Sequence, residues 1–317
     1  MLVYLLFFVG FVILIKGADL LVDGSSAIAK RLKISDLIIG LTIVSFGTSA
    51  PELIVNIFAG LSGHNDLAIG NIFGSNIANV FLILGISALI FPLDIDRNTS
   101  WRQIPFALLA TLLVGFLAND YILFHHNLSQ ISRIDGLILL ISFFIFISYT
   151  FGIAKIRGKN KPLIKKLDPP KAIIYIILGL IALGLGGRWI VSGATHIAQH
   201  FGMSQSLIGL TIIAIGTSLP ELATSAVAAY KKNSEIAVGN IVGSNIFNLL
   251  WILGLGSILS PIVYNPASNI DLYMVILSSF VLFCFIFIGK KNILERWQGG
   301  LFILIYATYL IFLIFKG

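Results

Sequence analysis

The sequence predicts an all-α polytopic membrane protein with about ten transmembrane helices in two inverted five-helix repeats. Three observations predict this fold. The first is composition: of 317 residues, 57% are hydrophobic and only 11% are charged, whereas soluble domains average about 45–50% apolar and about 25% charged residues. The second is a series of apolar segments of membrane-spanning length, and the third is an internal repeat. The composition alone excludes a soluble enzyme or a disordered chain.

Ten segments are long and apolar enough to cross a bilayer, which takes about 20 residues in a helix. Apolar runs such as Leu137–Ile141 lack the alternation of a membrane β-strand, so we expect helices. The first segment has no preceding positive charge and no cleavage site, which favours a membrane helix over a cleaved signal. The expected spans are residues 3–27, 36–60, 67–91, 103–118, 134–152, 172–197, 205–229, 236–260, 271–288 and 298–315.

The basic residues predict the orientation of these spans. Of the 21 Lys and Arg residues, 17 fall in connections on one side of the membrane, and only Lys16, Arg133, Arg188 and Lys316 do not. The positive-inside rule assigns the basic side to the cytoplasm. We therefore expect both termini to be extracytoplasmic and the basic segment between the halves to be cytoplasmic. The net charge of +7 then reflects topology, and a nucleic-acid partner is not expected.

The chain contains an internal repeat. Residues 34–92 align with residues 203–261 without a gap at an offset of 169, and about 25 of these 59 positions are identical. Each half holds five spans, an odd number, so the second copy enters the membrane from the opposite side. Secondary transporters with this architecture bind their substrates at the midplane between the halves. The expected units are residues 1–152 with motif 40–85, a basic linker 153–171, and residues 172–317 with motif 209–254.

Two carboxylates lie deep within apolar spans, at equivalent positions of the repeats. Glu52 and Glu221 have no basic residue in the same block, and a carboxylate at bilayer depth is costly and by default functional. Pro51 and Pro220 precede them. Because proline lacks an N–H and clashes with the preceding turn, we expect the carbonyls near residues 45–47 and 214–216 to be freed from the helical ladder. Such carbonyls can hold a cation.

Further polar residues recur at helical spacing around both glutamates, and each can offer an oxygen atom as a metal ligand. They are Thr48 and Ser49, Thr217 and Ser218, and the rows Asn71, Ser75, Asn79 and Asn240, Ser244, Asn248. Oxygen ligands suit hard cations, above all Ca²⁺ and also Na⁺. The single cysteine, Cys284, and five histidines near the span ends do not indicate a zinc site. Occupancy of one site by alternative ions is the physical basis of antiport.

At these residues the sequence resembles the cation/Ca²⁺ exchanger superfamily, in particular prokaryotic sodium/calcium exchangers. Both copies of its signature are present, as Gly47-Thr48-Ser49-Ala50-Pro51-Glu52 and Gly216-Thr217-Ser218-Leu219-Pro220-Glu221, each followed by Gly-Asn-x-x-Gly-Ser-Asn. The resemblance implies Glu52 and Glu221 as central Ca²⁺ ligands, with backbone carbonyls of Thr48 and Thr217, and Asn79 and Asn248 closing the ring. Flanking Na⁺ sites would use Ser49, Ser75, Ser218 and Ser244 with the carbonyls of Ser45 and Ala214.

The resemblance also implies that the first and sixth spans, rich in glycine (Gly17, Gly24, Gly186, Gly187 and Gly193), slide to alternate access. Some relatives carry Asp at one of the two positions of Asn79 and Asn248. Asparagine at both leaves two negative charges in the site, which weakens the case for K⁺ as an additional ion. We expect no cofactor, no obligate protein partner, and a location in the cell membrane.

Three other functions are possible for a membrane protein with two buried carboxylates. A Ca²⁺/H⁺ antiporter remains open, because a buried carboxylate can bind a proton. A cation channel is disfavoured, because channels usually build their filter by rotational symmetry around a pore. An intramembrane enzyme is not expected, since the sequence has no deep histidine and no motif such as His-Glu-x-x-His.

Lys16 could pair with Asp19 or Asp23, although a side chain extending to the membrane interface is the simpler interpretation.

Overall fold

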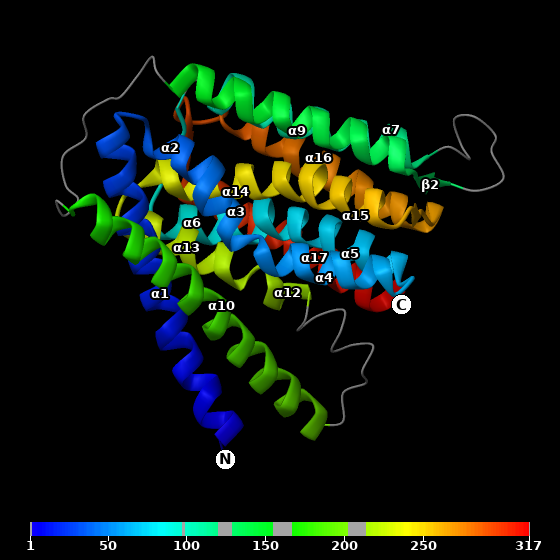
Figure 1. Cartoon of the computed structure of the whole chain (residues 1–317), viewed down its shortest axis with the longest axis horizontal. Helices are drawn as coiled ribbons and strands as arrows, with labels where there is room; N and C mark the ends of the chain where they lie inside the picture. The colour runs from blue at the N-terminus through cyan, green and yellow to red at the C-terminus, as the bar shows by residue number, and fades with distance from the viewer. Residues whose placement is uncertain (1, 97–98, 120–128, 155–166, 202–213, 317) are drawn as a thin grey trace.

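The computed structural model describes residues 2–96, 99–119, 129–154, 167–201 and 214–316 and confirms a helical membrane fold (Figure 1). The first half contains α1 (Leu2–Leu32), α2 (Asp36–Ile39), η1 (Gly40–Val44), α3 (Ser45–Thr48), α4 (Ala50–Leu61), α5 (Asn65–Ile77), η2 (Ala78–Leu84), α6 (Gly85–Ile90), β1 (Leu93–Asp94), η3 (Thr99–Gln103), α7 (Ile104–Ala118), β2 (Gln130–Ile131) and α9 (Arg133–Ala154). The second contains α10 (Pro169–His200), α12 (Ala214–Thr217), α13 (Leu219–Tyr230), α14 (Ser234–Ile246), η5 (Phe247–Ile252), α15 (Leu253–Leu259), β3 (Ile262–Val263), η6 (Pro266–Ser268), α16 (Asn269–Phe285), β4 (Ile293–Leu294) and α17 (Arg296–Lys316).

Within these residues, eight helices are long and apolar enough to span a membrane, and a bent pair makes a ninth. The predicted span 205–229 begins outside the described residues. Most of the predicted linker 153–171 also lies outside them. The first and sixth helices extend beyond the predicted 3–27 and 172–197, because their polar ends also stay helical. The count of about ten spans is therefore approximate.

Two spans form the centre of the molecule. In the helices over Asn65–Ile90 and Ser234–Leu259, 78% and 83% of the most apolar stretch is buried, against 28–44% in the other spans. Both central spans pass from α-helix into a π-helical segment, η2 and η5, halfway along. Segments of π-helix are rare and often mark functional positions. The remaining spans present apolar side chains such as Leu109 and Ile145 outward, as a bilayer requires.

The predicted span 36–60 is not one straight helix. Its two parts, Asp36–Thr48 and Ala50–Leu61, meet at an angle of 47°. The break falls at Ser49, with φ −82° and ψ 9°, because Pro51 supplies no N–H to the preceding turn. In the second half Ser218 has φ −85° and ψ 5° between α12 and α13. The repeated sequence therefore produces the same break twice.

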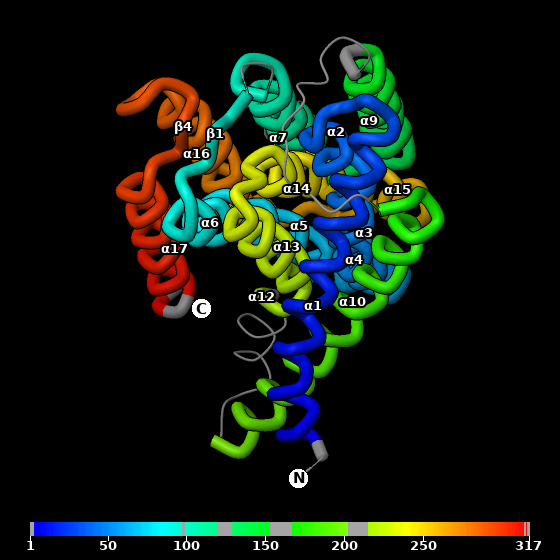
Figure 2. The backbone as a smooth tube through the Cα atoms, turned by 90° about the vertical axis from the view of Figure 1, so that its left-hand side faces the viewer, coloured from blue at the N-terminus to red at the C-terminus, as the bar shows by residue number. Residues whose placement is uncertain are grey.

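Helices α1 and α10 lie side by side and slant away from the other spans (Figures 1 and 2). Their backbones meet at glycines seven residues apart. A Cβ on Gly17 would lie 2.9 Å from the carbonyl oxygen of Gly179, and one on Gly186 would lie 2.8 Å from that of Gly10. Small residues allow such close approach between membrane helices. We call these contacts between Gly10, Gly17, Gly179 and Gly186 the glycine seam.

Two short antiparallel strand pairs join the halves. β1 pairs with β4 in the register Leu93↔Leu294, and β2 pairs with β3 in the register Gln130↔Val263. Figure 2 shows β1 and β4 together beside α16 and α17. Each pair takes one strand from either half of the chain, so the halves are joined by backbone hydrogen bonds as well as by side-chain packing.

A lysine after α13 ties α1 to the rest of the bundle. Lys231 Nζ lies 2.7 Å from Asp19 Oδ1 and 2.6 Å from Asp23 Oδ1, and also donates to the Asp19 carbonyl at 3.1 Å. Lys16, three residues from Asp19 and seven from Asp23, is the partner that proximity in the sequence allows. The structure instead pairs both aspartates with a residue more than 200 positions distant. This contact is not duplicated by the repeat, since Ser62 and Arg188 occupy the positions equivalent to Lys231 and Asp19.

Replacing Lys231 by Met is expected to destabilise the protein by about 2 kcal/mol. The Asp23 side chain is only 12% exposed and would keep its charge without a partner. Removing one member of a fully buried pair costs about 3–5 kcal/mol, and the partial exposure here reduces that loss. Thermal unfolding in detergent would measure it, with Lys30→Met, an exposed position on α1, as the control. Equal melting temperatures for both variants would contradict the prediction.

Candidate functional site

Glu52 and Glu221 lie in the first turns of α4 and α13, directly after the two helix breaks. Both are 1% exposed. The first turn of a helix has N–H groups without helical acceptors, and the helix dipole favours negative charge there. Each break therefore creates, in the middle of an apolar span, a position where a buried carboxylate is tolerated.

Serine hydroxyls from both halves hold each carboxylate. Glu221 Oε1 accepts from Ser49 at 2.9 Å and from Ser244 at 3.3 Å. Glu52 Oε1 accepts from Ser218 at 3.4 Å and from Ser75 at 3.5 Å. In each case one serine belongs to the glutamate's own half and the other to the opposite half. The two glutamates are thus part of one cluster at the contact between the repeats.

The other carboxylate oxygens have no donor. Glu52 Oε2 and Glu221 Oε2 are buried and have no hydrogen-bond partner within the described part of the chain. The same holds for Asn79 Oδ1 and Asn248 Oδ1. Native proteins satisfy nearly all buried polar groups, so these four acceptors are available to a positively charged or donating ligand. The two repeats contribute these four oxygens in equivalent pairs.

Asn79 and Asn248 are oriented by a second asparagine pair that sequence reasoning did not single out. Asn79 Nδ2 donates to Asn245 Oδ1 at 2.9 Å, and Asn248 Nδ2 donates to Asn76 Oδ1 at 3.0 Å. Because each amide nitrogen is engaged by the opposite half, the amide oxygen remains available. The signal was present in the sequence, since Asn76 and Asn245 are identical members of the repeated Gly-Ser-Asn block.

Thr48 and Thr217 also bridge the halves. Thr48 Oγ1 donates to Asn240 Oδ1 at 3.1 Å, and Thr217 Oγ1 donates to Asn71 Oδ1 at 3.3 Å. Their side chains therefore position α5 and α14 against the broken spans.

The Ser45 carbonyl differs from the sequence-based expectation. It is not freed from the helical ladder, because it accepts from the Ser49 N–H at 3.0 Å; the Thr48 hydroxyl oxygen lies 3.4 Å away. The proline effect falls two positions further on, at the Gly47 carbonyl, whose helical donor would be the nitrogen of Pro51. In the second half the Ser218 N–H bonds to Ile215 O at 3.1 Å. Ala214 begins α12, and its side chain lies outside the described atoms.

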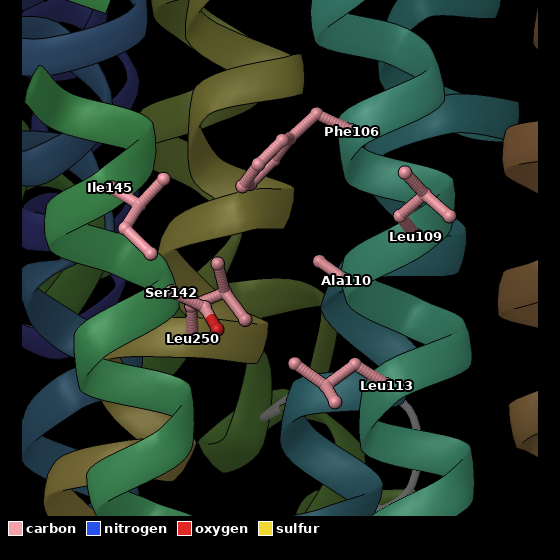
Figure 3. Close-up of a pocket in the computed structure, with 7 residues that line it drawn as sticks. All are labelled: Phe106, Leu109, Ala110, Leu113, Ser142, Ile145 and Leu250. Atoms are coloured by element: carbon pink, nitrogen blue, oxygen red, sulfur yellow. The ribbon is translucent and has the colours of Figure 1, made fainter. Parts of the chain in front are cut away.

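The ligand chemistry of the cluster is that of a hard cation site. Among the described residues, no group of three or more His, Cys, Asp or Glu side chains could hold a metal ion. The available metal ligands are the oxygens of two carboxylates, of amides and of hydroxyls, which suit Ca²⁺ and Na⁺ rather than softer transition metals. An apolar groove of about 280 Å³ between α7 and α9, with Leu250 at its base, is lined by no carboxylate or amide side chain (Figure 3). Its one hydroxyl, on Ser142, donates to Ile138 O.

Comparison with known proteins identifies the family. The sequence model for the sodium/calcium exchanger protein family matches residues 2–152 and 171–315. The chain belongs to this family. It is 40% identical to the putative antiporter CaxA of Alkalimonas amylolytica, over 95% of each protein, and 31% identical to the sodium/calcium exchanger MaX1 of Methanosarcina acetivorans, over 98% of each.

The exchanger also shares its fold with a solved structure. The sodium-calcium exchanger NCX_Mj, soaked with 2.5 mM Na⁺ and 0.1 mM Ca²⁺, superposes with a TM-score of 0.82 at 32% identity, covering 98% of each chain. The structure without Na⁺ and Ca²⁺ gives a TM-score of 0.83. The chain is therefore a multi-pass membrane cation exchanger for Ca²⁺ with the inverted-repeat fold predicted from its sequence.

Proposed function

We propose that this exchanger moves Ca²⁺ across the cell membrane in exchange for Na⁺, with both ions binding in turn between Glu52 and Glu221. The observation that carries the proposal is the set of four buried oxygens without a donor, on Glu52, Glu221, Asn79 and Asn248. They come in pairs from the two repeats, so an ion between them contacts both halves equally. A site at this position suits alternating access.

The charge of the site supports exchange between these ions. Two carboxylates contribute a charge of −2, which one Ca²⁺ or two Na⁺ would neutralise. Asparagine rather than aspartate at positions 79 and 248 adds no further charge. A third monovalent ion such as K⁺ therefore has no carboxylate to balance it.

The serine clusters are the proposed Na⁺ ligands. Ser49 and Ser244 lie 3.0 Å apart beside Glu221, and Ser218 and Ser75 lie 3.3 Å apart beside Glu52. Each pair offers two hydroxyl oxygens next to one carboxylate, which suits a monovalent cation. The carbonyls of Ser45 and Ala214 would complete these sites, with Ser45 O using the lone pair that the Ser49 N–H leaves accessible. The carbonyls of Thr48 and Thr217 would instead join Glu52 and Glu221 around Ca²⁺.

The proposed arrangement in the membrane follows the positive-inside rule. Residues 1–152 and 172–317 form the two inverted units, and the basic segment 153–171 joins them in the cytoplasm. Both termini are then extracytoplasmic. The link between α4 and α5 faces outward, and the link after α13 that carries Lys231 faces the cytoplasm.

The function is tested by ⁴⁵Ca²⁺ uptake into proteoliposomes, driven in parallel by an outward Na⁺ gradient and an outward H⁺ gradient. We expect uptake with the Na⁺ gradient, abolished in Glu52→Gln. Asp66→Asn is the matched control, because Asp66 is an exposed carboxylate in the first turn of α5. Uptake driven only by the H⁺ gradient would identify a Ca²⁺/H⁺ antiporter instead. Ca²⁺ flux that needs no counter-ion gradient and does not saturate would indicate a channel.

A further inference from the structure

The polar face of α4 continues one turn beyond Glu52. Asn56 follows Glu52 by four residues and therefore lies on the same helical face. It is 1% exposed, and both its Nδ2 and its Oδ1 are without a hydrogen-bond partner in the described structure. Leaving such groups unsatisfied costs about 1–3 kcal/mol each. An asparagine in this position therefore needs a ligand.

Asn71 on α5 provides a second unpartnered group nearby. Its Oδ1 accepts from Thr217 Oγ1, which directs its Nδ2 away from that threonine. This Nδ2 is buried and also has no partner among the described residues. α4 and α5 are antiparallel neighbours, and Ser75, one turn along α5 from Asn71, contacts Glu52. Asn71 therefore lies level with Asn56.

The second repeat shows which groups face each other at this level. Asn240, the counterpart of Asn71, donates through Nδ2 to Ser225 Oγ at 3.0 Å and to Glu221 O at 3.4 Å. Ser225 is the counterpart of Asn56 at the offset of 169 residues. The second repeat thus closes this level with a direct hydrogen bond. The first repeat has the longer side chain and does not form the contact.

The unpartnered groups match the hydrogen-bonding capacity of one water molecule. Asn71 Nδ2 and Asn56 Nδ2 are donors, and Asn56 Oδ1 is an acceptor. A water can accept from both donors and donate to the acceptor, and buried waters typically make about three hydrogen bonds of this kind. A cation bound directly between two N–H₂ groups is disfavoured, because donors would face its positive charge.

We propose that Asn56 and Asn71 bind an ordered water one turn from Glu52, and that this water is the first hydration partner of a cation leaving or approaching the site on the α4–α5 side. The inference rests on the proposed function of the Glu52/Glu221 site. It makes the two ends of the site chemically different. The α4–α5 end is hydrated, and the α13–α14 end is closed by the Asn240–Ser225 contact.

The bound water is tested directly by a crystal structure of the purified exchanger at a resolution that shows ordered solvent. We expect a density peak at about 3 Å from Asn56 Nδ2, Asn56 Oδ1 and Asn71 Nδ2, the usual hydrogen-bond distance, and no peak between Asn240 and Ser225. A direct Asn56–Asn71 hydrogen bond, or no density between them, would overturn the proposal.

The hydration role is tested with Asn56→Leu, which keeps the side-chain size and removes both polar groups. We expect Ca²⁺ turnover to fall about tenfold, the effect of losing one net hydrogen bond of about 1.4 kcal/mol, while the Kd for Ca²⁺ stays within about twofold. The melting temperature should stay close to that of the wild type, because the apolar burial of the leucine offsets the loss of the hydrogen bonds to water. Phe58→Leu, on the exposed face of the same helix, is the matched control.

Asn56→Ser is the second variant, which places the residue of the second repeat in the first. It should allow a direct bond from Asn71 and lower turnover in the same way. Wild-type turnover in both variants would overturn the hydration role. Wild-type protein that fails to exchange Ca²⁺ at all would instead contradict the proposed function, so the two failures are distinguishable.

Discussion

Replacing either Glu52 or Glu221 by Gln is expected to weaken Ca²⁺ binding by more than about 100-fold and to abolish exchange. The substitution removes one of two negative charges opposite a divalent ion. It also replaces one oxygen of the carboxylate by an N–H₂ group, whose hydrogens repel a cation. Charge-assisted contacts are about twice as strong as neutral ones, and about 2.7 kcal/mol corresponds to a factor of 100.

The two glutamate variants should behave alike, because they remove equivalent members of one symmetric cluster. Calorimetric titration of Ca²⁺ into purified protein would give the affinity, and ⁴⁵Ca²⁺ flux would give the activity. Asp66→Asn, which changes charge at the exposed start of α5, should match wild type in both. A Gln variant at either position that binds and transports Ca²⁺ normally would place the ion elsewhere.

Gly17→Leu is expected to destabilise the exchanger by about 3 kcal/mol and to reduce transport in proportion to the folded protein lost. At Gly17 a Cβ would lie 2.9 Å from both Gly179 O and Leu183 N. Both are backbone atoms, so no side-chain rotation relieves the contact and α1 must separate from α10. Overpacking of this kind costs about 1–3 kcal/mol, and the longer leucine side chain places the loss at the upper end.

Gly184→Leu is the control for this substitution. Gly184 lies on α10 within the same helix pair, and none of the described atoms is within 4 Å of a Cβ at that position. Thermal unfolding and the yield of monodisperse protein should separate the two variants. If Gly17→Leu were as stable as Gly184→Leu, the close backbone contact described here would be wrong.

Much of this fold can be predicted from the sequence because the two halves of the chain contain the same sequence motif. The repeat locates Glu52 and Glu221 on equivalent broken spans, and helical spacing brings Ser75 and Asn79 to the same face as Asn71. The structure places these residues in one cluster between the halves.

Other features depend on how the two halves pack against each other. The spacing of residues along one helix does not determine these contacts. Asn76 adjoins Ser75 but points across the interface, where it orients Asn248. The transition from α5 into the π-helical η2 also shifts the helical phase near Asn79, so a regular period is not maintained. Lys231 pairs with aspartates on α1 because tertiary packing brings a distant loop closer than the neighbouring Lys16.

The glycine seam is unchanged when the two halves are exchanged. Gly10 and Gly17 correspond to Gly179 and Gly186 at the offset of 169, so exchange converts the contact of Gly10 with Gly186 into that of Gly17 with Gly179. If the two access states are related by this exchange, the packing energy of these glycine contacts is the same in both and does not favour either. The resting population is then decided by residues that the repeat does not duplicate. Lys231 with its two aspartates is such a group, and substitutions there should shift the balance between the states rather than the affinity for the ion.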